Sequence, residues 1–167
     1  MILATPAQRF GLLRRSRTVA LVGASANHAR ASYFVFSYLR TKGRFEVAPI
    51  NPSVAEIDGV ASYPTLAAYA AGRGAPDLVD VFRRPSEAPA VARDAVAVGA
   101  RAIWFQYGVV NEDAIAIADR AGLDVVVDRC LKVESARFDG GLSSGGFDSG
   151  IVWSQRIPLL GGLPERG

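Results

Sequence analysis

The stretch TVALVGASANHARASYF, residues 18–34, decides how the rest of the chain is interpreted. An apolar run from Val19 to Val22 ends at Gly23, and a small, polar segment separates it from an aromatic-rich one. This order predicts a buried strand, a tight turn and the start of a helix, where backbone N–H groups favour an anion. The G-x-G-x-x-G pattern of dinucleotide-binding turns is absent, so the ligand stays open at this point.

Four further apolar runs, rich in β-branched residues, have the same character: EVAPI (46–50), DLVDVF (77–82), RAIWF (101–105) and DVVVD (124–128). Because these runs are nearly continuous rather than alternating, they predict strands that are buried on both faces. The segments between the runs predict helices over 31–42, 65–71, 87–98 and 112–121. The alternation predicts an α/β fold with a five-stranded parallel sheet between two layers of helices.

The order of the strands is expected to follow other doubly wound sheets. We expect the order 3-2-1-4-5, with a ligand crevice at the carboxyl ends of the first and fourth strands. Gln106 and Gly108 end the fourth strand and would contact the ligand there. Pro49 lacks a backbone N–H, so we expect a bulge or a short strand around it. Ser86 and Asn111 precede two of the helices and are expected to cap them.

The composition indicates one globular domain without a membrane span. The chain has 167 residues, 50% of them hydrophobic and 21% charged, and no apolar run is long enough to cross a bilayer. The segment 1–17 lacks the continuous apolar region of a secretory signal, so a cytoplasmic location is expected. The net charge of +3 comes from 17 arginines against two lysines. Composition bias explains most of these arginines, and because they are scattered, no nucleic-acid partner is expected.

The character of the chain changes after Phe138. DGGLSSGGFDSG (139–150) is typical of a flexible linker. The apolar IVWSQRIPLLGGLP that follows either docks on a partner subunit, packs back on the domain or is disordered. We therefore expect a domain over 1–138 and a linker with a C-terminal tail over 139–167. A homo-oligomer or a protein partner could form through this tail.

Two loops after predicted strands contain candidate ligand contacts. Gly23-Ala24-Ser25 is small enough to bring backbone N–H groups to a phosphate, and Arg30 could reach one of its oxygens. A plain strand-to-helix turn is the alternative. Asn51-Pro52 follows the second strand, where an NAD site has an acidic residue. The amide disfavours NAD and tolerates a phosphorylated ribose, while an ordinary Asn-Pro turn is the alternative.

Two adjacent arginines follow the third strand. Arg83 and Arg84 come directly after Phe82, near the mouth of the expected crevice, where guanidinium groups suit phosphates. The alternatives are a solvated pair or salt bridges to Asp80 or Glu87.

The single cysteine, Cys130, follows the fifth strand and excludes an intramolecular disulfide. Its neighbours Arg129 and Lys132 are cations, which are expected to lower the pKa of the thiol. A buried structural cysteine is the alternative. A base for this thiol would have to be the only histidine, His28, if the fold brings the two loops together. No cluster has the spacing of metal ligands.

Five motifs follow one another in an order typical of one family: VALVGAS (19–25), APINP (48–52), DLVDVFRRP (77–85), AIWFQYGVVNE (102–112) and VVVDRCLKVESARF (125–138). Together they resemble the small stand-alone CoA-binding proteins, which are similar to the N-terminal CoA-binding domain of the succinyl-CoA synthetase α subunit. The resemblance covers residues 16–138. It implies a Rossmann-like domain that binds coenzyme A or an acyl-CoA.

The resemblance also implies roles for the loops. Gly23-Ala24-Ser25 would meet the CoA phosphates, and Asn51-Pro52 would help to hold the nucleotide. The segments 82–84 and 106–108 would flank the ligand, and the DRC segment, 128–130, is typical of the stand-alone members. Ligase activity is not implied, because the chain is too short for the second domain that carries a phosphorylated histidine.

The leading hypothesis is a module that binds CoA or an acyl-CoA without catalysing a reaction. One alternative is an NAD(P)-dependent oxidoreductase, although the missing glycines and the missing acidic residue count against it. Another is a thiol function, in which Cys130 forms a mixed disulfide with CoA or reacts with an acyl thioester. A third is an interaction module whose site is vestigial.

Overall fold

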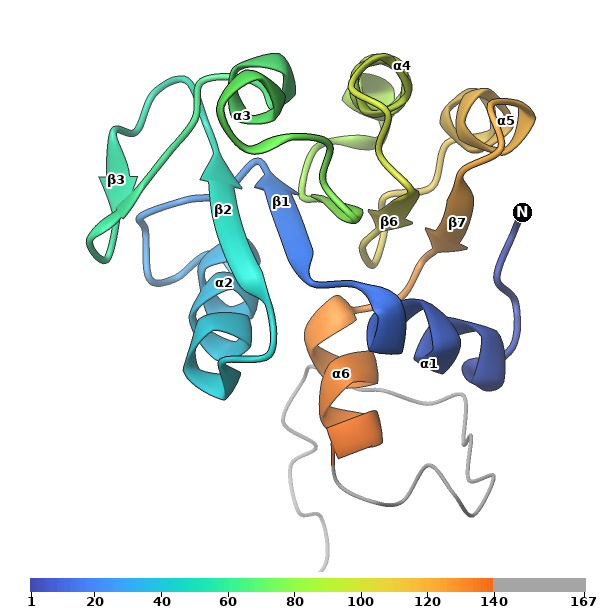
Figure 1. Cartoon of the computed structure of the whole chain (residues 1–167), viewed down its shortest axis with the longest axis horizontal. Coiled ribbons are helices and arrows are strands. Elements are labelled where there is room, and N and C mark those ends of the chain that lie inside the picture. The colour runs from blue at the N-terminus through green and yellow to red at the C-terminus, as the bar shows by residue number, and fades with distance from the viewer. Residues whose placement is uncertain (140–167) are drawn as a thin grey trace, which may run out of the picture.

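The computed structural model describes residues 1–139, and its centre is a sheet of five parallel strands (Figure 1). The strands are β1 (Thr18–Val22), β2 (Glu46–Ile50), β5 (Leu78–Val81), β6 (Ala102–Phe105) and β7 (Asp124–Val127). They lie in the order β2-β1-β5-β6-β7. A separate hairpin pairs β3 (Glu56–Ile57) with β4 (Val60–Ala61). The predicted α/β fold with five parallel strands is confirmed.

Helices cover both faces of the sheet (Figure 1). One face carries α3 (Leu66–Arg73), α4 (Ala88–Ala97) and α5 (Glu112–Arg120), and the other carries α1 (Pro6–Arg15), α2 (Ala31–Lys42) and α6 (Leu131–Asp139). Successive side chains of a strand point to opposite faces, so β5 contributes Val79 and Val81 to the first core and Leu78 to the second. The predicted three-layer arrangement is confirmed.

The predicted strand order 3-2-1-4-5 is wrong, and Pro49 explains why. The third main strand, β5, pairs with β1 on the side away from β2, so β2 lies at an edge of the sheet. A residue without an N–H fits at an edge, because there the missing donor can face away from the neighbouring strand. The carbonyl of Pro49 accepts the N–H of Tyr63 on the outer side at 2.9 Å. The register between β1 and β2 continues through Pro49 without the predicted bulge.

The two helices that the sequence did not predict, α1 and α6, pack against each other. Thr5 caps α1 through a capping box with Gln8, and Leu12 and Leu13 bury its inner side. The second helix begins directly after Cys130. Both ends of the described chain therefore cover the same face of the sheet as α2.

The four predicted helices are present with boundaries close to those expected. Asn111 caps α5 as predicted, because its side chain accepts the N–H of Ala114 at 3.0 Å. The predicted cap Ser86 is wrong, since Ser86 lies inside the short 3₁₀ helix η1 (Pro85–Glu87) that leads into α4.

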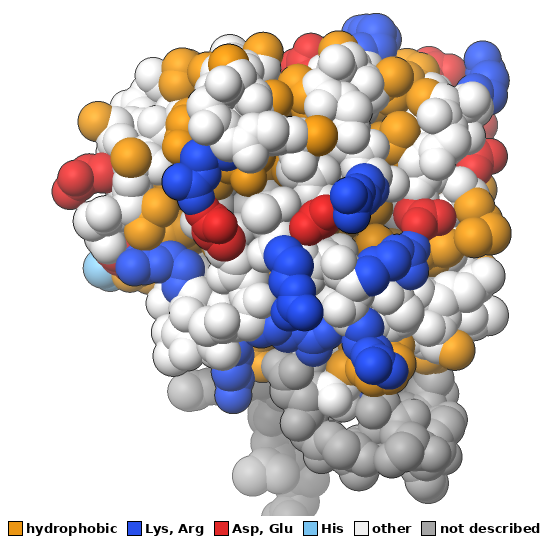
Figure 2. Space-filling model, in the orientation of Figure 1, with side chains coloured by type: hydrophobic (Ala, Val, Ile, Leu, Met, Phe, Trp, Pro, Cys, Tyr) orange, Lys and Arg blue, Asp and Glu red, His pale blue; other side chains and the backbone are white. Residues whose placement is uncertain are grey.

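Basic and acidic side chains lie beside one another on the face of the molecule that Figure 2 shows. Ion pairs of this kind join Arg73 to Glu46 of β2 and Arg101 to Asp77, which precedes β5. Exposed pairs of this type contribute at most about 1 kcal/mol each. Within residues 1–139, no helix has the length and the hydropathy needed to cross a membrane.

Candidate functional site

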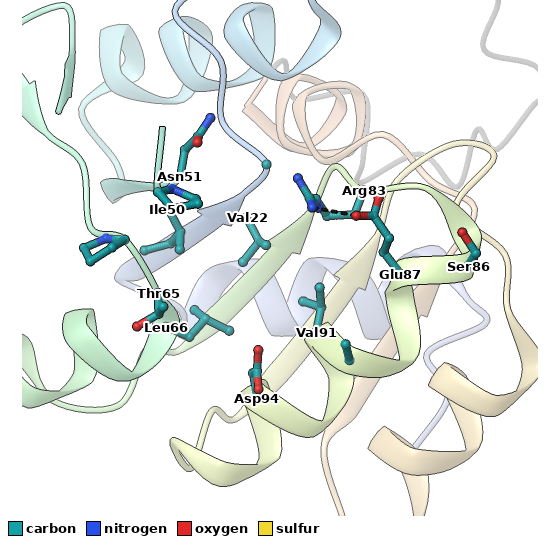
Figure 3. A pocket seen from close by; sticks show the side chains of 14 residues that line it. Val22, Ile50, Asn51, Thr65, Leu66, Arg83, Ser86, Glu87, Val91 and Asp94 are labelled. Carbon is teal, nitrogen blue, oxygen red and sulfur yellow. Dashed lines mark hydrogen bonds and ion pairs between the residues drawn. The ribbon is translucent and has the colours of Figure 1, made fainter. Parts of the chain in front are cut away.

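A cavity of about 450 Å³ opens at the carboxyl ends of β1 and β2, between α3 and the segment that leads into α4 (Figure 3). Its walls combine apolar and polar residues: Val22, Gly23, Ile50, Asn51, Pro52, Pro64, Thr65, Leu66, Arg83, Ser86, Glu87, Ala90, Val91 and Asp94. The predicted crevice at the ends of the first and fourth main strands is wrong, because β5 separates β1 from β6. The cavity lies instead where β1 has β2 on one side and β5 on the other.

Gly23 follows β1 at the wall of the cavity, and the space around it admits no side chain. Its φ of +84° belongs to the region that favours glycine. A Cβ here would lie 2.2 Å from the carbonyl oxygen of Phe82 and 3.0 Å from Cδ of Arg83. The N–H of Phe82 donates to the carbonyl of Val22 at 2.8 Å and holds the two loops together. Gly23 thus makes the predicted tight turn.

Asn51 ties the loop after β2 to the loop after β1. Its Nδ2 donates to the carbonyl of Ala24 at 2.7 Å, and its Oδ1 accepts the N–H of Ser53 at 2.8 Å. Both ends of the amide are therefore used within the protein. Ala24 is fully buried, so its side chain faces the core, whereas Pro52 is exposed at the rim of the cavity. The Ser25 hydroxyl accepts an N–H from its own loop.

Arg83 supplies the basic side chain among the residues that line the cavity (Figure 3). Its Nη2 lies 2.6 Å from Oε1 of Glu87, as one of the predicted alternatives had it. Arg84 also donates to Glu87, at 3.2 Å, but its side chain is 82% exposed and does not line the cavity. The hydrogen bond from Arg84 is the main cause that lowers the pKa of Glu87. Glu87 therefore holds Arg83 as an ionised partner.

Two predicted candidates of the first loop lie outside the cavity lining. Arg30 is exposed and precedes α2, and its side chain makes no capping hydrogen bond. His28 is also exposed, and its ring stacks on Tyr33 with 4.1 Å between the ring centroids. His28 therefore has the position of a solvated loop residue.

A second group of predicted residues lies away from the cavity, where β5, β6 and β7 end. Gln106 is 4% exposed, and its Nε2 donates to Oδ1 of Asp80 at 2.7 Å. Asp80 is fully buried in β5, and burial raises its pKa to about 7 against the opposing effect of that hydrogen bond. Gln106 is therefore part of a buried polar pair rather than a wall of the cavity.

The loop after β7 is fixed by hydrogen bonds to β6 and to the loop that follows β6. Oδ1 of Asp128 accepts the N–H of Gly108 at 2.9 Å, and the carbonyl of Arg129 accepts the indole N–H of Trp104 at 2.7 Å. Cys130 follows and is partly buried. The expected lowering of its pKa is wrong, because burial of the thiol raises the pKa more than neighbouring charge lowers it.

Sequence reasoning missed the far wall of the cavity. Thr65 caps α3, and Ser86 belongs to η1. Val91 and Asp94 lie three residues apart and share one face of α4. Their spacing and the cap at Thr65 are readable in the sequence, but nothing there shows that the two helices meet across the ends of β1 and β2.

A family model described as a CoA binding domain matches residues 17–136. The chain belongs to the CoA-binding domain family. The uncharacterized protein YneT of Bacillus subtilis is 35% identical over 125 residues, which are 75% of this chain and 90% of YneT. A solved structure of a hypothetical protein from Pyrococcus horikoshii is 34% identical, with a TM-score of 0.77, and the match covers 81% of this chain and 93% of that one.

A more distant likeness concerns the fold alone. A dinucleotide-forming acetyl-coenzyme A synthetase of Korarchaeum cryptofilum is 23% identical, with a TM-score of 0.59. The match covers 68% of this CoA-binding domain and 27% of the synthetase chain.

The loops at one end of the cavity of this CoA-binding domain offer hydrogen-bond donors to an anion. The absence of a Cβ at Gly23 lets the loop after β1 lie directly against the Phe82 carbonyl and Arg83. Within residues 1–139, the N–H groups of Ser25 and Ala26 donate to no other group. Unpaired N–H groups at a strand-to-helix turn and a guanidinium are both donors that suit a phosphate.

Proposed function

We propose that the domain binds coenzyme A or an acyl-CoA in this cavity and does not by itself catalyse a reaction. The observation that carries the proposal is the closeness of Gly23 to Arg83 at one end of the cavity. A turn without a side chain lets backbone N–H groups approach a phosphate, and the guanidinium donates to it with charge. In this proposal the phosphate replaces Glu87 as the partner of Arg83. In the structure, Nη2 of Arg83 lies 2.6 Å from the Glu87 carboxylate.

The division of the cavity supports this class of ligand. CoA has an anionic half, formed by its pyrophosphate and 3′-phosphate, and a long uncharged pantetheine arm. The anionic half would lie at the Gly23 and Arg83 end. The uncharged arm would follow the apolar wall, which consists of Val22, Ile50, Leu66 and Val91.

Isothermal titration calorimetry of the purified protein with CoA, acetyl-CoA and dephospho-CoA tests the proposal. We expect all three to bind, with dephospho-CoA weaker because it lacks the 3′-phosphate. Binding of none of them at high micromolar concentrations would overturn the proposal. Native mass spectrometry of the protein as purified adds a check, since a CoA species is expected to accompany it.

A pair of arginine variants locates the site. Arg83→Ala removes a charged donor from the cavity, so we expect CoA affinity to fall about tenfold or more. Arg93→Ala is the matched control, because Arg93 is an exposed arginine on α4 that does not line the cavity. Equal effects of the two variants would place the ligand elsewhere.

The alternative ligand is a nicotinamide nucleotide, which fluorescence titrations with NADH and NADPH test. The loop 51–55 after β2 contains no acidic residue, and the Asn51 amide is engaged by Ala24 and Ser53. We therefore expect NADH and NADPH to leave the protein's fluorescence unchanged at concentrations that saturate with CoA. The cytoplasmic location and an oligomer or partner through residues 139–167 stay predictions.

A further inference from the structure

The charged side chains that line the cavity do not by themselves favour an anion. Among the described residues of its wall, one guanidinium, that of Arg83, accompanies two carboxylates, those of Glu87 and Asp94. An ionised carboxylate beside the proposed phosphate position repels the phosphate. The proposed CoA site therefore needs a group that offsets this charge, and the contacts of Glu87 identify one.

The carboxylate of Glu87 is shared between two arginines, one that lines the cavity and one outside it. Its Oε1 lies 2.6 Å from Nη2 of Arg83, the arginine of the cavity wall (Figure 3). Its Oε2 accepts the Nε–H of Arg84 at 3.2 Å and the backbone N–H of Arg84 at 3.3 Å. Because each oxygen serves a different arginine, the contact to Arg83 can break while the contacts to Arg84 stay.

Arg84 keeps Glu87 ionised and in place even without Arg83. The side-chain hydrogen bond from Arg84 is the largest cause that lowers the pKa of Glu87, and the charge of Arg83 is a smaller one. The backbone N–H of Arg84 also ties the carboxylate to the start of η1, in which Glu87 is the last residue. The contact to Arg83 joins side chains that are 45% and 29% exposed, so water and salt weaken it. Arg83 is thus the partner that an incoming anion can take from Glu87.

We propose that Glu87 is an internal competitor of the ligand: its carboxylate occupies Arg83 in the empty cavity, and Arg84 retains the carboxylate when a phosphate of the ligand displaces it. This inference rests on the proposed binding of CoA and concerns how that binding is regulated. The carboxylate and the phosphate are both anions that accept from the same guanidinium, so only one of them holds it fully at a time. The affinity of the site therefore depends on how well Glu87 is held away from Arg83.

Arg84 has a role in this inference although it does not line the cavity. Its side chain is 82% exposed. Among the described residues, removal of Arg84 leaves Glu87 with Arg83 as its charged partner. The phosphate then has to separate an ion pair whose carboxylate has no second arginine to hold it. Arg84 is therefore a positioning residue, which supports phosphate binding through Glu87 and not by contact with the ligand.

Isothermal titration calorimetry of the full chain with CoA measures the competition. Glu87→Gln removes the charge but keeps an oxygen that accepts the Arg84 backbone N–H, so we expect CoA to bind about three- to fivefold more tightly. Arg84→Ala is expected to bind CoA about threefold more weakly. Because Arg84 is largely exposed, this second variant tests the inference even if Glu87→Gln does not fold.

Two matched controls lose the same kinds of charge outside the cavity. Glu112→Gln changes an exposed glutamate of α5, and Arg93→Ala changes an exposed arginine of α4. Neither residue lines the cavity, so both variants are expected to bind CoA within about 1.5-fold of the wild type. Effects of the controls as large as those of Glu87→Gln and Arg84→Ala would show that the net charge alone sets the affinity.

Double variants show whether the effects pass through Arg83. In an Arg83→Ala chain, Glu87→Gln is expected to gain at most about 1.5-fold, because the guanidinium for which Glu87 competes is gone. In a Glu87→Gln chain, Arg84→Ala is expected to lose as little, because no charged carboxylate is left to retain. Additive effects in both pairs would mean that Glu87 acts only as a distant charge, and would overturn the competition.

Inorganic pyrophosphate separates this inference from CoA binding itself. It has phosphate groups without a nucleoside or a pantetheine arm, so Glu87→Gln is expected to tighten its binding by a factor similar to that for CoA. If CoA binds and Glu87→Gln tightens neither ligand, the competition is overturned and the proposed function stands. Weaker binding to Glu87→Gln would also overturn it, since Glu87 would then position Arg83 for the ligand.

Two outcomes reject the proposed function as well. If pyrophosphate binds and CoA does not, the proposed function fails, while the pyrophosphate titrations of the same variants still decide on the competition. If neither ligand binds to the wild type or to Glu87→Gln, both proposals fail.

Discussion

At Gly23 two loops approach so closely that a methyl group would collide with the neighbouring backbone. We expect Gly23→Ala to destabilise the protein by about 3 kcal/mol, because a Cβ 2.2 Å from the Phe82 carbonyl forces a loop to move. Gly122→Ala is a matched control, with the same φ of +84° and nothing within 4 Å of its Cβ. It is expected to cost only about 1 kcal/mol for the backbone conformation. Urea unfolding measures both values.

The same pair of variants tests the site. Gly23→Ala is expected to weaken CoA binding at a temperature where the variant is still folded, because the displaced loop carries the phosphate contacts. Gly122→Ala lies before β7, at the opposite end of the sheet, and is expected to bind as the wild type does. Equal stability losses in the two variants would show that the contact with Phe82 is unimportant.

Asp80 makes the stability of the protein depend on pH. Its pKa is about 7 in the folded protein and about 3.9 in an unfolded chain, so the folded state binds the extra proton between these values. Stability is therefore expected to fall as the pH rises from about 4 to 7, by roughly 4 kcal/mol from this group. Asp80→Asn removes this slope, which urea titrations at several pH values detect. Parallel curves for the two proteins would contradict it.

The sequence identified part of the cavity lining for a simple reason. Gly23, Asn51 and Arg83 each follow a predicted strand, and in parallel sheets such residues gather at one edge. Gln106 also follows a strand, but β5 lies between that strand and β1. Its place in a buried pair with Asp80 depends on the strand order, which the spacing of motifs does not contain.

At the scale of elements, the strands and the amphipathic helices could be predicted from the sequence. Which strands lie next to one another in the sheet could not. Periodicity placed α2 at its observed residues, because its apolar side chains repeat with helical spacing. It missed α6, whose buried residues include Glu134 and Ser135, because polar residues give no apolar stripe. Pro49 was the residue that bore most directly on strand order. In a strand with a neighbour on each side, a proline leaves a hydrogen bond of the ladder unmade, so it favours an edge position.

The buried pair between Arg9 and Glu134 attaches α1 to α6. The two side chains are each 2% exposed, and Nε of Arg9 lies 2.7 Å from Oε2 of Glu134. Arg9→Met leaves the carboxylate buried without this partner, so we expect a loss of about 3–5 kcal/mol. The double variant Arg9→Met with Glu134→Leu is expected to lose less than Arg9→Met alone. A double-mutant cycle in urea measures this, and additive losses would contradict the coupling.

In the whole molecule, the two faces of the sheet are covered by different parts of the chain. The face with α3, α4 and α5 borders the cavity, while the opposite face carries α2 together with α1 and α6 from the two ends of the described chain. Cys130 and Asp80 lie on that second face, where α6 covers the core. The C-terminal boundary of the domain, at the end of α6, therefore bears on function.

The proposed boundary at residue 138 gives the last prediction. Among the described residues, the two cores extend from Leu3 to Leu131, with Phe138 packed at the margin. A chain ending at Phe138 is therefore expected to unfold within a few degrees of the full chain and to bind CoA with an affinity within about twofold. A chain ending at Val127 lacks α6, uncovers the core around Leu131 and is expected not to fold cooperatively. Thermal unfolding and calorimetry test both, and a folded 1–138 chain that no longer binds CoA would assign part of the site to residues 139–167.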